Sequence, residues 1–193
     1  MKSLSKDPTI LTHPNIPKPL HGISPRNIMG QKWWDIKRKE AYKSTNYRCS
    51  ACNVPREKAK YYRRLEGHEY YNYNYTTGTL ILKKIVPLCH SCHNFIHSGR
   101  LYAMYEKGEI TFERIKNILE HGFRILSENA LDAFWGTIQI ADTLGIETDV
   151  EPQFPEPCDV RWHEWKMVIE SKKYYSKFKN EEEWENFYNE KKI

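Results

Sequence analysis

Two Cys-x-x-Cys pairs bracket the middle of the chain and constrain its fold more than any other feature. The first pair is Cys49 and Cys52, and the second is Cys89 and Cys92. Cysteines paired at this spacing are typical of structural zinc sites, in which four thiolates close a tetrahedral shell. The chain has five cysteines, and an odd number argues against a closed set of disulfides. We therefore predict a structural zinc that clamps the two knuckles together.

The second cysteine pair runs directly into a histidine-rich segment. His93 and His97 stand four residues apart, so in a helix both imidazoles lie on one face. His68 lies on a predicted strand at residues 65–75 and can face that helix. Three imidazoles would leave coordination positions open for a divalent ion that stabilises a scissile phosphate and its leaving oxygen. Two alternatives stay open: the histidines only pack near the zinc, or His90 or His93 replaces one zinc thiolate.

The charge of the chain is unevenly distributed. Residues 1–100 contain 18 Lys or Arg and 6 Asp or Glu, whereas residues 101–193 contain 12 and 19. A basic half that also carries the metal motifs predicts a polyanionic partner, with nucleic acid as the first candidate. The alternative is that the two halves attract each other. The candidate phosphate contacts lie on a predicted helix at 31–44 and in a tyrosine-rich segment: Lys37, Arg38, Lys39, Lys43, Arg63 and Arg64.

Three regions follow one another along the chain. Residues 1–30 are rich in proline and predict an arm with little regular structure. Residues 31–106 combine a basic helix, a knuckle, a hairpin, a second knuckle and a helix, which predicts a zinc-bound ββα core. Residues 107–193 are acidic and show helical apolar stripes, so a mainly helical extension is expected. The predicted fold class is α+β.

The chain shows no sequence signal for a membrane. No apolar run approaches the roughly 18 residues of a membrane span. The first residues lack the apolar core of a signal peptide. We expect a soluble cytoplasmic protein without a membrane partner.

The order of these motifs resembles the HNH endonucleases of the treble-clef, ββα-metal type. The resemblance covers about residues 45–100: Cys-x-x-Cys, then Leu-Glu-Gly-His-Glu at 65–69, then Val-Pro-Leu-Cys-His-Ser-Cys-His-Asn-Phe-Ile-His at 86–97. The tryptophan pair ahead of the first knuckle and the helical tail are similar to phage-encoded HNH proteins, which implies the cytoplasm of a bacterial host. The resemblance implies metal-dependent cleavage of DNA, with His93 and His97 as ligands of a catalytic Mg, Mn, Ni or Zn ion.

The first and middle motifs depart from the pattern that the resemblance implies. In one register, His68 is a metal ligand and Glu69 occupies the place of the histidine that activates water. In the other register, His68 is the base, and Gly67 takes the ligand position without a side chain. The Leu-Glu before the pair favours the first register. The middle motif usually has an asparagine at the position where this chain has Lys84.

Two functions are therefore expected from the sequence. The first is a DNA endonuclease with His68, Glu69, His93 and His97 in its catalytic site. The alternative is a zinc-stabilised adaptor or inhibitor that binds DNA or a protein and has lost catalysis. In either case, the acidic C-terminal region is a candidate surface for a protein partner.

Overall fold

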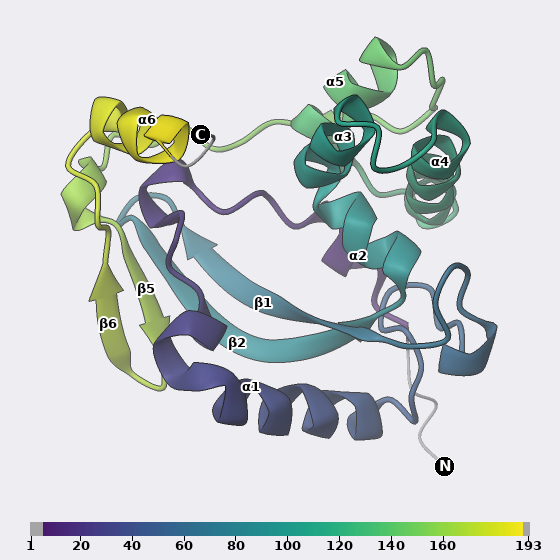
Figure 1. Cartoon of the computed structure of the whole chain (residues 1–193), viewed down its shortest axis with the longest axis horizontal. Coiled ribbons are helices and arrows are strands. Elements are labelled where there is room, and N and C mark those ends of the chain that lie inside the picture. The colour runs from purple at the N-terminus through teal and green to yellow at the C-terminus, as the bar shows by residue number, and fades with distance from the viewer. Residues whose placement is uncertain (1–5, 191–193) are drawn as a thin grey trace. The chain divides into compact units, whose positions relative to one another are not determined.

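The computed structural model describes residues 6–190, and the described chain is an α+β protein (Figure 1). The fold class predicted from the sequence is confirmed. The helices are α1 (Pro25–Ser44), α2 (His90–Ile96), α3 (Ser98–Glu106), α4 (Phe112–Ser127), α5 (Trp135–Thr143) and α6 (Glu181–Glu190). The strands are β1 (Glu66–Asn74), β2 (Thr79–Leu88), β3 (Ala133–Phe134), β4 (Pro152–Gln153), β5 (Lys166–Ile169) and β6 (Lys172–Tyr175).

The chain forms two compact units that are interleaved in sequence. Among the described residues, unit 1 comprises 6–15, 38–68 and 86–155, and unit 2 comprises 16–37, 69–85 and 156–190. The sequence analysis predicted three consecutive regions instead: 1–30, 31–106 and 107–193. The β1–β2 hairpin contributes to both units, and the strand ends next to the two knuckles belong to unit 1.

Unit 1 is organised around helices α2, α3, α4 and α5, which lie together in Figure 1. Helix α4 begins after Thr111, whose side chain caps the helix by accepting a hydrogen bond from a backbone N–H. Its buried face is apolar at helical spacing, including Ile115, Ile118, Leu119 and Leu126. This apolar stripe explains why α4 packs into the core.

Helices α2 and α4 approach each other closely at a glycine. The rings of Phe95 and Phe123 meet edge to face with centroids 5.2 Å apart. A Cβ atom added to Gly122 would lie 2.0 Å from the Phe95 ring. Because Gly122 has no side chain, the Phe95 ring can lie directly against its backbone. This contact allows α2 and α4 to pack closely.

Unit 2 contains a four-stranded mixed sheet in the order β1-β2-β5-β6. Strand β5 pairs in parallel with β2, where Leu80 lies opposite Met167, and pairs antiparallel with β6. Leu80, Met167 and Leu20 are fully buried, and the buried side chains of Tyr71 and Trp165 belong to the same core. This core requires no metal ligand.

The strands β5 and β6 correct the expectation that residues 107–193 are mainly helical. Helices occupy 112–127, 135–143 and 181–190, but residues 166–169 and 172–175 are extended. The physical reason is nonlocal: alternate side chains of β5 are buried while its backbone pairs with β2. Pairing with a distant strand therefore sets the conformation of this segment.

The N-terminal segment is more regular than the sequence predicts. Short 3₁₀ helices form at Pro8–Thr12 and Lys18–Leu20. Helix α1 begins at Pro25 rather than at residue 31, and its backbone kinks at Gly30, where φ is 84°. A proline in the first turn and a glycine at the kink are compatible with this path. None of the helices between residues 6 and 190 has the length and apolarity needed to cross a membrane.

Candidate functional site

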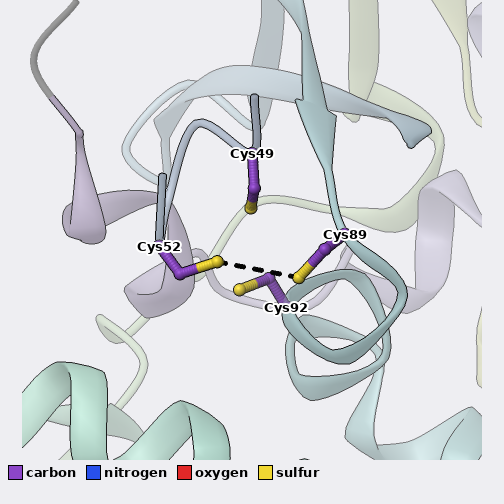
Figure 2. A group of neighbouring side chains, drawn as sticks. All are labelled: Cys49, Cys52, Cys89 and Cys92. Atoms are coloured by element: carbon purple, nitrogen blue, oxygen red, sulfur yellow. Dashed lines mark hydrogen bonds between the residues drawn. The ribbon is translucent and has the colours of Figure 1, made fainter. Parts of the chain in front are cut away.

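Four cysteines of unit 1 point their sulfur atoms toward a common centre (Figure 2). Cys49 and Cys52 come from a tight turn before β1. Cys89 directly follows β2 as the N-cap of α2, and Cys92 lies in α2. Backbone hydrogen bonds shape the first knuckle: the Cys49 N–H donates to the Val54 carbonyl. All four sulfurs lie within 4.8 Å of one another.

The geometry and burial of this cluster suit a zinc ion. The sulfurs of Cys52 and Cys89 are 3.8 Å apart. A tetrahedron with Zn–S bonds of about 2.3 Å has sulfur–sulfur edges of about 3.8 Å. Hydrogen bonds with Cys49 and Cys52 raise the pKa of the buried Cys92 thiol, so four thiolates at this spacing require a cation. The four-cysteine cluster could therefore hold zinc, and neither His90 nor His93 belongs to it.

A histidine that the sequence did not indicate lies beside this cluster. The Nε2 of His121, on α4, is 3.4 Å from the Sγ of Cys92. An imidazole N–H at this position can donate to a thiolate and offset part of its charge. His121 follows Cys92 by 29 residues, and no local spacing rule connects them.

A second cluster brings His68, His93 and His97 together. His68 lies on β1, His93 on α2, and His97 is the residue that caps the end of α2. Their ligand atoms all lie within 4.8 Å of one another. The ring centroids are 5.5 Å apart for His68 and His93, 5.0 Å for His68 and His97, and 4.8 Å for the helical pair. The structure thus assembles the three histidines that the sequence singled out.

Burial keeps two of these imidazoles uncharged. His68 is only 4% exposed, and burial together with His97 and His93 lowers its pKa well below the ordinary value. Burial also lowers the pKa of His97 to about 3. Among the described residues, the Nδ1 of His68 is a buried nitrogen without a hydrogen-bond partner. Neutral imidazoles with available lone pairs are metal ligands, so this cluster could also hold a metal ion.

The other predicted catalytic residue, Glu69, does not belong to the histidine cluster. It follows His68 directly on β1, and consecutive side chains of a strand point to opposite faces. Burial and the nearby charge of Glu69 raise the pKa values of Tyr71 and Tyr73, which share its side of the strand. Lys84, at the middle-motif position, is exposed, and its Nζ lies 5.1 Å from the ring centroid of Tyr70.

The predicted DNA contacts lie on two segments. Lys39 and Lys43 are exposed on α1, and Lys37 and Arg38 are half-buried there. Arg63 and Arg64 are exposed in the loop before β1. In this loop, the Arg64 guanidinium stacks 4.7 Å from the ring centroid of Tyr62.

Polar residues that the sequence analysis did not assign surround the histidine cluster. Glu66 accepts hydrogen bonds from the Nδ1 atoms of both His90 and His93. His13 places a fourth imidazole edge-on to His68, with ring centroids 6.2 Å apart. Glu66 could have been found, because it precedes His68 by two residues and so shares its face of the strand. His13 carries no such signal.

Known proteins provide no independent guide to this site. No protein-family model matches the chain. No curated protein and no solved structure shows significant similarity to it.

Proposed function

We propose that this chain is a metal-dependent DNA endonuclease that hydrolyses phosphodiester bonds. The observation that carries the proposal is the cluster of three imidazoles from β1 and α2, with ligand atoms within 4.8 Å of one another. Three protein ligands leave coordination positions for a phosphate oxygen and water. The arrangement of the knuckles, hairpin and helix in sequence, which resembles an HNH nuclease, supports the same reaction.

The two clusters would take different metals for different purposes. Cys49, Cys52, Cys89 and Cys92 would bind a structural zinc, because four sulfurs fill its shell. The histidines would bind a divalent ion, and three imidazoles suit zinc or nickel better than magnesium, with manganese also to be tested. When bound, this ion would polarise the scissile phosphate and stabilise the leaving oxygen.

In this proposal, His68 acts as a metal ligand rather than as the base. Its position beside His93 and His97 supports the register in which His68 is a ligand. In that register Glu69 would be the base, but strand alternation places its side chain on the opposite face from His68. His13 is a second candidate for accepting the proton of the attacking water. Burial lowers the pKa of His13 to about 4, so its imidazole is uncharged at neutral pH but is a weaker base than an ordinary histidine.

Cations interleaved with aromatic rings would hold the DNA. The Lys60 ammonium lies 5.3 Å from the ring centroid of Tyr61, next to the pairing of Arg64 with Tyr62. Such groups suit phosphate contact and base stacking. Arg63 is exposed in the same loop, and the cations of α1 add further candidate contacts: Lys37, Arg38, Lys39 and Lys43.

Plasmid nicking by a double variant tests the proposal. His93→Ala combined with His97→Ala removes two of the three imidazoles. Loss of the Lewis acid costs several kcal/mol, so nicking of supercoiled DNA should fall by about 100-fold or more. The protein should stay folded and keep the zinc at the cysteines. His163→Ala, which removes an exposed histidine of unit 2, is the matched control and should cut normally. Undiminished cutting by the double variant would overturn the site assignment.

The second candidate function is a zinc-stabilised adaptor or inhibitor without catalysis. It is favoured by the position of Glu69 on the strand face opposite His68 and by Lys84 at the middle-motif position. The wild-type protein should be incubated with supercoiled DNA and Mg, Mn, Ni or Zn ions in turn. Absence of cleavage with every ion, together with measurable binding of DNA or a protein, would favour the adaptor.

A further inference from the structure

We infer that Glu66, His90 and Arg114 are positioning residues that fix which nitrogen of His93 faces the histidine cluster. This inference rests on the proposed metal site. The three residues come from β1, α2 and α4, and all belong to unit 1. They form one chain of hydrogen bonds that ends on His93.

The chain of hydrogen bonds begins at Arg114. Its Nη2 lies 3.0 Å from the Nε2 of His90 and 3.2 Å from the hydroxyl oxygen of Tyr62. A guanidinium only donates hydrogen bonds, so the Nε2 of His90 must accept. The guanidinium also lies over two aromatic rings, 4.8 Å from the ring centroid of Tyr61 and 5.6 Å from that of Tyr62. These contacts hold Arg114 in place.

The tautomer of His90 follows from this contact. A neutral imidazole that accepts at Nε2 carries its proton on Nδ1. The Nδ1 of His90 lies 3.0 Å from the Oε1 of Glu66, so it donates to the carboxylate. Arg114 and Glu66 therefore specify the same tautomer of His90 from its two sides.

Glu66 then specifies the tautomer of His93. Its second oxygen, Oε2, lies 2.5 Å from the Nδ1 of His93. An ionised carboxylate only accepts, so this Nδ1 carries a proton and the lone pair of neutral His93 is on Nε2. A carboxylate that orients a ligating histidine in this way also raises the basicity of the ligand.

The expected consequence is a preorganised ligand. Without the carboxylate, the His93 ring could rotate or present a protonated Nε2 to the ion. Loss of such a partner typically weakens metal binding by about 10- to 100-fold. Neither Glu66 nor Arg114 touches the ion in this scheme, so the effect would reach the site only through His93.

The test combines imidazole NMR with a metal titration. Two-bond ¹H–¹⁵N correlations should show the Nδ1–H tautomer for His90 and His93 in wild-type protein loaded with zinc at the cysteines only. Glu66→Gln retains the size of the side chain but has one accepting oxygen and a donating amide. The variant should show a mixed or Nε2–H tautomer of His93 and bind Co²⁺ at the histidines about 10- to 100-fold more weakly.

Two substitutions of Arg114 provide a second test, with a larger and a smaller expected effect. Arg114→Met removes the donor to His90 and should shift the tautomer of His90 with a smaller loss of Co²⁺ affinity. Arg114→Lys restores a donor and should recover part of that loss. The control is Glu120→Gln, which changes an exposed carboxylate on the same helix and should alter neither readout.

An Nε2–H tautomer of His93 in the wild type would overturn the inference. An unchanged tautomer and unchanged Co²⁺ affinity in Glu66→Gln would also overturn it. If the wild-type histidines bind no ion, the proposed nuclease site fails, but the tautomers still decide whether the hydrogen-bond chain exists. The two failures are therefore distinguishable.

Discussion

The four-cysteine and three-histidine clusters share helix α2 and a similar spacing of their ligand atoms, yet they differ in what they can do. Cys92 and His93 are adjacent in the chain but belong to different clusters. The cysteines offer four charged donors, which complete a tetrahedral shell. The histidines offer three imidazole donors and leave that shell open. The number and charge of the donors, rather than their separation, distinguish a site suited to structure from a site suited to chemistry.

Loss of one cysteine tests the structural half of this comparison, the role of the four-cysteine cluster in folding. Cys92→Ser should abolish zinc binding and unfold much of unit 1, since structural zinc contributes on the order of 10 kcal/mol to small domains. Zinc content and far-UV circular dichroism measure both effects. By contrast, His93→Ala with His97→Ala should leave the zinc and the circular dichroism unchanged.

Cys158→Ser is the matched control, because Cys158 is exposed and lies outside the cluster. It should keep the zinc content and thermal stability of the wild type. A zinc-free Cys92→Ser protein that melts like the wild type would contradict the structural role of the cysteines.

A substitution at Gly122 should affect the two clusters to different extents. Gly122 packs against α2, which carries ligands of both clusters. Gly122→Ala places a methyl group against Phe95 and should destabilise unit 1 by about 1–3 kcal/mol, as overpacking does. Among the described residues, the histidine cluster offers three ligands and the cysteine cluster four, so the metal affinity of the histidines should fall more than that of the cysteines. Denaturant unfolding and metal titration check the two effects.

The matched control is Gly99→Ala on α3, where an added Cβ has no neighbour within 4 Å. This variant should be as stable as the wild type or slightly more stable, since alanine favours a helix. Equal stability of Gly122→Ala and the wild type would show that α2 and α4 pack less closely than described.

Local spacing indicated the ligand pairs within each cluster, because each pair lies on one short segment. Both cysteine pairs and the pair His93 and His97 are set by the backbone of a knuckle or one helical turn. Residues whose position depends on distant pairing were not predictable in this way. His121 approaches Cys92 from α4, and Arg114 reaches His90 from the same helix.

The strand order was missed for the same reason. Residues 166–169 become β5 only because the backbone of β2, more than 80 residues earlier, is available for pairing. Glu66 is an intermediate case. Its place on the face of His68 follows from strand alternation, whereas its two histidine partners depend on how α2 packs.

Unit 2 contains neither metal-binding cluster and so provides a reference. The pH dependence of its stability should be small. The Nδ1 of His21 accepts a hydrogen bond from the Trp184 indole, and burial lowers the pKa of His21 below 6.5. The unfolded chain therefore binds this proton more readily. The contribution of the His21–Trp184 hydrogen bond to the stability of unit 2 should be complete above pH 6.5 and should decline as the pH falls further. The loss should be at most about 1.5 kcal/mol, the value of one hydrogen bond.

The indole N–H resonance of Trp184, followed by NMR between pH 7.5 and 5, measures this effect. His21→Gln keeps a hydrogen-bond acceptor but does not titrate, so its profile should be flatter. Identical profiles for the variant and the wild type would assign the pH dependence to another group.

Anomalous scattering at the zinc edge, from crystals soaked in zinc, tests the central claim most directly. We predict two peaks in unit 1. One should lie among the sulfurs of Cys49, Cys52, Cys89 and Cys92, and the other among the imidazoles of His68, His93 and His97. A single peak at the cysteines would contradict the assignment of a second, catalytic metal to the histidines.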